Sequence, residues 1–179
     1  TPRIAVDSTG NSILVVWHES NQVGDDYDIM ARKCTSGTWG NLENVSGDAN
    51  LSRSADLVID TGGNYHVVWE DLDAKNIVYR KRNADNTWGG KTAVDTTSSR
   101  SMGAAIAISS NGYIHVAWHD DNSDWDILYR YFNGTSWSSV ANVSNNPGVT
   151  DCVAAITTDS NNDVHIAWKD YHDIYYAHT

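Results

Sequence analysis

The chain of 179 residues is poor in the features that mark several common protein classes. It has only two cysteines, which excludes a disulfide-rich scaffold and a thiolate metal cluster. No apolar run approaches the ~20 residues of a membrane-crossing helix, so we expect no membrane span. Lysine and arginine number 12 against 23 acidic residues, and the net charge of −11 argues against a nucleic-acid partner, because such partners need clustered basic residues.

The aromatic residues are distributed unevenly, with one Phe against eight Trp and nine Tyr. Four of the tryptophans belong to a seven-residue motif that recurs with little change. The copies are Ile13–Glu19, Tyr65–Asp71, Ile114–Asp120 and Val164–Asp170. Their tryptophans lie 52, 49 and 50 residues apart, and self-similarity at such a period predicts a repeat architecture.

Each repeat divides into short strand-like pieces separated by turns rich in Gly, Asn, Asp and Ser. The last repeat ends before a fourth piece. Four short antiparallel strands per ~50 residues, with no helical periodicity, predict an all-β fold, a β-propeller of four-stranded antiparallel blades. We therefore expect four blades, the last lacking its outer strand, in a single propeller or partial propeller domain over 1–179. The expected repeats are approximately 1–48, 49–97, 98–146 and 147–179.

These residues resemble a known family. The succession of His-Val-x-Trp, x-Asp, Ile-x-Tyr-Arg and Gly-Thr-Trp is similar to the sialidase-type, Asp-box-like repeats of bacterial and archaeal propeller proteins. The Asp boxes are degenerate, because the Asp position five residues before Trp39, Trp88 and Trp137 holds Cys, Asn and Phe. The resemblance implies a propeller fold. It also implies, as one alternative, a fragment of a sialidase-like glycoside hydrolase.

The motif strand has two largely apolar faces, as stacked blades require. In Ile114–Asp120, Trp118 lies on one face and the small Ala117 on the other, which lets the next blade approach. A histidine stands three residues before the tryptophan in three repeats, where the first repeat has Leu14, so we expect a packed position rather than a catalytic or metal-binding one. His18, Glu70, His119 and Lys169 follow the tryptophans, and we expect that position to be solvated.

Carboxylates crowd the loops at one end of the predicted blades, which we call the top. Two polar positions recur in every repeat, one always Asp or Glu and the other Asp or Asn. We expect them to stabilise turns, with Arg32, Arg80 and Arg130 as partners. The positions are Glu19, Asp71, Asp120 and Asp170, and Asp28, Asn76, Asp126 and Asp173. The functional alternative is calcium, which takes six to eight oxygen ligands. No cofactor is otherwise required. The calcium candidates are Asp120, Asp121 and Asp124.

Residues that break the repeat are the better candidates for a ligand. Ring-bearing side chains precede the third strand in three repeats, and such side chains stack on sugar faces. These are Tyr27, Trp125 and His172. The alternative is that each covers a neighbouring blade. Three further top residues could anchor an anionic ligand. These are Arg53, Arg100 and Asp151.

We therefore expect a non-enzymatic binding or display module, extracellular or at the cell surface, with a glycan as its ligand. The other alternative is a purely structural surface-protein repeat. The open edge of the last blade, Asp173–His178, predicts a homodimer by edge pairing. Cys34 and Cys152 fall at opposite ends of their blades, too far apart for the ~4.4–6.8 Å Cα separation of a disulfide, so we expect two free thiols.

Overall fold

The structure is a computed structural model that describes residues 1–20, 27–95, 97–121, 125–145 and 152–179. In these residues the chain forms four antiparallel sheets of four, four, four and three strands. Each sheet is a simple meander in which consecutive strands are hydrogen-bonded. The predicted all-β fold of four-stranded antiparallel blades, with the last blade lacking its outer strand, is confirmed.

We number the sheets blade 1 to blade 4 in chain order. Blade 1 contains β1 (Arg3–Val6), β2 (Ser12–Ser20), β3 (Tyr27–Thr35) and β4 (Thr38–Asn44). Blade 2 contains β5 (Ser52–Ile59), β6 (Tyr65–Asp71), β7 (Asn76–Arg82) and β8 (Thr92–Ala93). Blade 3 contains β9 (Ser101–Ile108), β10 (Ile114–Asp120), β11 (Asp126–Phe132) and β12 (Ala141–Asn142). Blade 4 contains β13 (Cys152–Thr158), β14 (Val164–Lys169) and β15 (Ile174–His178).

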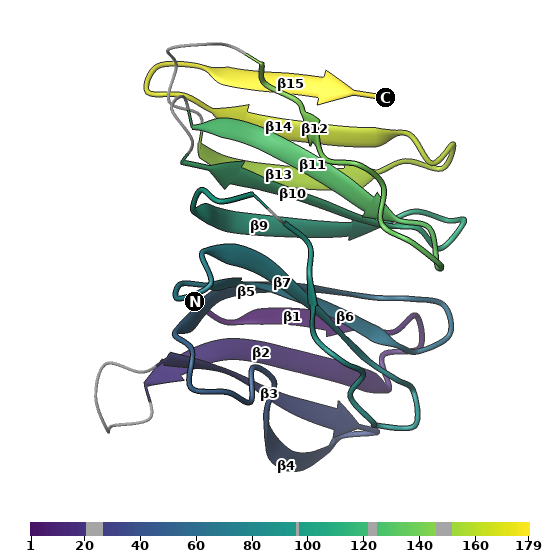
Figure 1. The fold of residues 1–179 in the computed structure, drawn as a ribbon. Coiled ribbons are helices and arrows are strands. Elements are labelled where there is room, and N and C mark those ends of the chain that lie inside the picture. Colours follow the sequence, from purple (N-terminus) through teal and green to yellow (C-terminus); the bar gives the residue numbers. More distant parts are fainter. Residues whose placement is uncertain (21–26, 96, 122–124, 146–151) are drawn as a thin grey trace.

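The four blades stack on one another in chain order (Figure 1). The first strand of each blade after blade 1 lies against the first and second strands of the blade before it. Blades 1 and 4 therefore lie at opposite ends of the stack, and each keeps one face uncovered. Strands β6 and β10, in the two middle blades, are buried along all seven residues.

Three apolar clusters fill the spaces between consecutive blades, and all follow one rule. The tryptophan face of each blade packs on the opposite face of the preceding blade, where the residue before the tryptophan is small. Trp69 thus shares a cluster with Val16, and Trp118 with Val68. In the third cluster Trp168 packs with Ala117. The expectation that small residues opposite the tryptophan admit the next blade is confirmed.

The repeated histidines are packing residues, as expected. His66 and His115 are buried, and each joins a tyrosine on the next strand to a polar group at the end of the first strand. In blade 2, His66 pairs with Tyr79 Oη at 2.7 Å and with Asp60 at 3.2 Å. Equivalent contacts link His115 to Tyr129 and Ser109, and His165 to Tyr176. Blade 1 replaces the His–Tyr pair by Leu14 and Ala31, so an apolar pair can substitute for it.

Among the residues that the structure describes, the three repeated arginines bind carbonyl oxygens and not carboxylates, so the predicted pairing is wrong. Arg32, Arg80 and Arg130 each donate from Nε to a carbonyl oxygen in the outer part of their own blade. Arg80 and Arg130 also donate from Nη1 to carbonyl oxygens of the preceding blade, those of Val45 and Val94. A guanidinium has several donors in a fixed fork, which lets it bridge two peptide carbonyls. Arg80 and Arg130 therefore tie consecutive blades together.

Candidate functional site

The top of the molecule is the end at which each second strand runs into the third and the chain enters the next blade. Its repeated carboxylates mostly bind loop groups. Asp71 accepts from Ala74 N and Asn50 Nδ2, and Asp170 accepts from the backbone of residues 172 and 173. Ser46 Oγ donates to Asp28 and accepts from Ile29 N. The prediction that these positions stabilise turns is confirmed for them.

The position after the tryptophan, which we expected to be solvated, is exposed in blade 4 at Lys169 but buried in blades 2 and 3. Glu70 and His119, which follow the tryptophans of blades 2 and 3, are only 3% and 9% exposed. Their burial follows from stacking, because this position faces the next blade along the chain. Glu70 Oε1 accepts a 2.7 Å hydrogen bond from Gly103 N in blade 3. Sequence comparison within one blade contains no signal for that contact between blades.

Glu70 is the centre of a charged cluster. Its Oε2 accepts from Arg53 Nε at 2.9 Å, and the Arg53 side chain is 41% exposed while that of Glu70 is 4% exposed. A hydrogen-bonded ion pair of this kind is shorter and stronger than a neutral contact. We call Arg53, Glu70, Arg100, His119 and Trp125 the top cluster. Three of its members are predicted ligand residues, whereas Glu70 and His119 are not.

The indole of Trp125 stacks on the imidazole of His119, with centroids 5.9 Å apart and planes inclined by 20°. Trp125 has a φ of 54°, which is rare for a bulky residue. Lys75 occupies the same position in blade 2 with a φ of 59°, so the loop shape repeats and only the side chain differs. Trp125 therefore covers a histidine of its own blade.

Burial governs the charge of the histidines beside the cluster. It lowers the pKa of His119, although the nearby carboxylate of Glu70 acts in the opposite direction. Burial also lowers the pKa of His18, and the N-terminal amino group and Arg53 add to that effect. Both imidazoles are therefore neutral at neutral pH. They act as ring-contact groups, while the formal charges of the cluster are those of Glu70, Arg53 and Arg100.

The remaining predicted ligand residues are dispersed or undescribed. Tyr27 contacts His18 edge to face at 5.8 Å, within blade 1. His172 is exposed in the turn before β15, and its backbone N donates to Asp170. Asp151 lies outside the described residues. Two hydrogen bonds join Arg100 and Asp121. Arg100 N donates to the side-chain Oδ1 of Asp121 at 2.7 Å, and Asp121 N donates to Arg100 O at 2.9 Å.

The predicted calcium ligands are engaged with the protein where they are described. Asp120 is fully buried, and its carboxylate accepts hydrogen bonds from the hydroxyls of Thr97, Ser99 and Ser101. Asp124 lies outside the described residues. Among the residues that the structure describes, no group of three or more His, Cys, Asp or Glu side chains is arranged to hold a metal ion.

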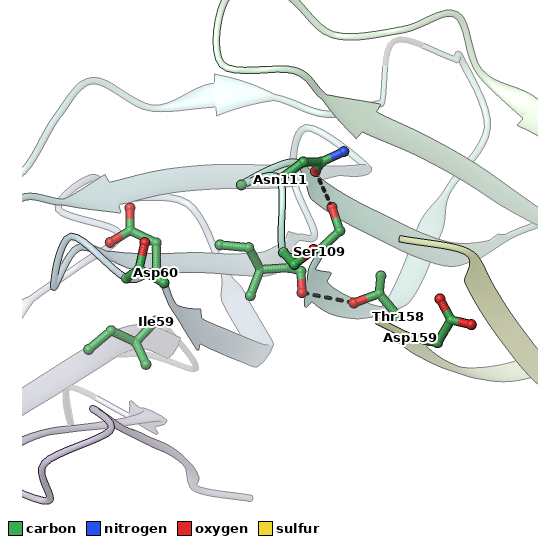
Figure 2. A pocket seen from close by; sticks show the side chains of 10 residues that line it. Ile59, Asp60, Ser109, Asn111, Thr158 and Asp159 are labelled. Carbon is green, nitrogen blue, oxygen red and sulfur yellow. Dashed lines mark hydrogen bonds between the residues drawn. The ribbon is translucent and has the colours of Figure 1, made fainter. Parts of the chain in front are cut away.

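A hollow of about 450 Å³ lies at the opposite end of the blades, where the first strands of blades 2, 3 and 4 end. Asp60 and Asp159 lie on opposite sides of it, with Ser109 and Asn111 between them (Figure 2). Asp60 already binds Asn64 and His66, and Asp159 binds backbone groups of its own turn. Because these are repeated turn residues, the hollow follows from the repeat, and the top cluster remains the stronger candidate.

The sequence matches no protein-family model and no curated protein. A protein of unknown function from Dyadobacter fermentans DSM 18053 has a similar structure, with a TM-score of 0.76 at 12% identity. The match covers 99% of this chain and 64% of that one, so the chain spans less than two thirds of its length. The intramolecular trans-sialidase from Ruminococcus gnavus matches with a TM-score of 0.63 at 12% identity, over 98% of this chain and 42% of that one.

The chain has a β-propeller fold. A fucose lectin from Kordia zhangzhouensis also matches, with a TM-score of 0.50 at 18% identity, over 79% of this chain and 97% of that lectin. At these identities the likeness shows the fold alone. Propellers with this fold thus include an enzyme, a lectin and a protein of unknown function. None of the described residues of this propeller forms a helix long and apolar enough to cross a membrane.

Proposed function

We propose that this propeller is a non-enzymatic, extracellular carbohydrate-binding module whose ligand contacts the top cluster. The observation that carries the proposal is the Trp125–His119 stack beside the Glu70–Arg53 ion pair. An indole offers a flat apolar surface for one face of a sugar ring, and Arg53 and Arg100 offer donors for hydroxyl or carboxylate oxygens. The fold shared with a fucose lectin and a trans-sialidase supports the same ligand class.

Binding without catalysis is favoured by the state of the carboxylates. Most glycosidases use two carboxyl groups across the scissile bond, one of them available as a proton donor. Both oxygens of Glu70 are engaged, one by Arg53 and one by Gly103 N. The buried Asp120 accepts from three hydroxyls. We include calcium in the proposal only as a stabiliser of the loop that contains Asp120, Asp121 and Asp124.

The test is a glycan array that includes fucosylated and sialylated glycans, read for the native chain and for Trp125→Ala. We expect the variant to lose at least about tenfold in affinity, which corresponds to about 1.4 kcal/mol. Trp39→Ala is the matched control, because Trp39 is 46% exposed but lies on the outer strand of blade 1. Circular dichroism establishes that both variants fold.

Three results would contradict the proposal. An unchanged array signal for Trp125→Ala would mean that the ligand does not contact the top cluster. Turnover of a fluorogenic sialoside by the native chain would identify a sialidase-like glycosidase instead. If the native chain neither binds a glycan on the array nor hydrolyses the sialoside, the repeat is purely structural. Chelation with EDTA, read by melting temperature and array signal, tests the calcium component separately.

A further inference from the structure

The two end blades expose apolar faces that the middle blades cover. In blade 1, Ile4 and Val6 of β1 are 65% and 50% exposed. The positions equivalent to Ile4 in blades 2 and 3 hold Leu57 and Ile106, which are 6% and 5% exposed because the preceding blade covers them. No other blade of the structure covers blade 1 on this side, so its tryptophan face is open.

Blade 4 is open on the opposite face. Each blade has an isoleucine near the start of its third strand, and in every blade it pairs with the residue that follows the tryptophan. Ile29, Ile77 and Ile127 are fully buried, whereas Ile174 in blade 4 is 75% exposed. Two shallow apolar hollows lie on this face, and the residues that line them include Ala155, Ala167 and Ile174. Exposed apolar surfaces of this kind mark interaction sites.

We propose that a second copy of the chain covers these faces head to tail, with blade 1 of one copy stacked on blade 4 of the other. The argument is continuity with an interface that the chain makes three times. In each case a tryptophan face packs on the opposite, small-residue face of the blade before it. Blade 1 presents the first kind of face and blade 4 the second. No new type of contact is needed.

Symmetry favours a dimer. Two head-to-tail contacts related by a twofold axis close a ring, whereas contacts that do not close produce a filament. Two copies supply eight blades, within the range of four to eight that propellers usually have. This arrangement differs from pairing through the edge of β15, because it buries the face of blade 1 as well as that of blade 4.

Sedimentation equilibrium over a range of micromolar concentrations tests the proposal. We expect a mass of twice 19.7 kDa for the native chain. Ile4→Glu and Ile174→Glu each place a charge on one of the two faces and should each yield monomers. Tyr171→Glu is the control, because Tyr171 is 81% exposed in the turn between β14 and β15 and should leave the dimer intact.

The decisive experiment mixes the two monomeric variants and measures the mass of the mixture. Ile4→Glu keeps the blade 4 face and Ile174→Glu keeps the blade 1 face, so the mixture should regain one contact and form a 1:1 dimer. This recovery also demonstrates that both variants are folded. A monomeric native chain, a dimeric Ile4→Glu variant or a mixture without dimer would each overturn the proposal. A dimeric Ile4→Glu variant would indicate edge pairing instead.

Discussion

Arg80 donates from Nη1 to the carbonyl oxygen of Val45 over 2.6 Å, and so ties the third strand of blade 2 to the end of the outer strand of blade 1. Arg130 makes the same bond to Val94 O one blade further on. Each guanidinium also lies over the tryptophan that precedes the outer strand of its own blade, Trp88 or Trp137. The repeated arginine is therefore a link between blades.

The first prediction concerns this link. Arg80→Met should lower the free energy of unfolding by about 1.5–3 kcal/mol, the range for hydrogen bonds to a charged group. Arg32→Met is the control, because Arg32 has the same contacts with Gly40 and Trp39 but no preceding blade in the chain to bind. Urea unfolding measures both. Equal losses would mean that the bond between blades contributes nothing.

The second prediction concerns Gly103, which has a φ of +62° and lies against the His119 ring. A Cβ added there would lie 2.6 Å from His119 Cε1. Gly103→Ala should cost about 1–2 kcal/mol for the left-handed backbone and about 1–3 kcal/mol more for overpacking. Gly112→Ala, with a φ of +84° and open space around the added methyl, should show only the backbone cost. Thermal unfolding of the two variants separates the terms.

The third prediction is a loss of stability in acid. Burial lowers the pKa of His115 from 6.5 to about 4 in the folded protein. The unfolded chain therefore binds the proton more readily, so the stability is complete above about pH 6.5 and falls by about 3 kcal/mol as the pH decreases toward 4. His115→Leu, which copies Leu14 of blade 1, should flatten this part of the profile. An unchanged slope of unfolding free energy against pH would contradict the assignment.

The fourth prediction concerns the thiols. Cys34 and Cys152 are both free in the structure, as expected, and Cys34 is 4% exposed while Cys152 is partly exposed. A thiol reagent needs access to its target. Under native conditions we expect one thiol to react quickly, and two to react in denaturant. Cys152→Ser should remove the fast phase, whereas Cys34→Ser should retain it.

Much of the fold could be predicted because one motif specifies one strand. The spacing of Trp17, Trp69, Trp118 and Trp168 marks four blades, and the strand bounds around them differ from expectation by only a few residues. The bounds of the short outer strands are harder to predict from the sequence. In blade 2, β8 has two residues, and Trp88 joins the sheet only through a bridge to Arg82.

The candidate site was only partly predictable. Arg53, Arg100 and Trp125 stand out because they break the repeat. Glu70 does not, because its role depends on Arg53 of its own blade and on Gly103 of the next. Comparing the repeats aligns each residue with its counterparts. Such a comparison contains no information on which residue of a neighbouring blade contacts a given position.

The sequence by itself determined the strand order, the number of blades and the face on which each tryptophan lies, since these depend on local alternation and turn composition. Only the tertiary structure decided what each repeated position contacts. The isoleucine near the start of the third strand is buried as Ile77 and exposed as Ile174. The residue type is the same, but burial is a property of the neighbouring blade, and the last blade has none within the chain.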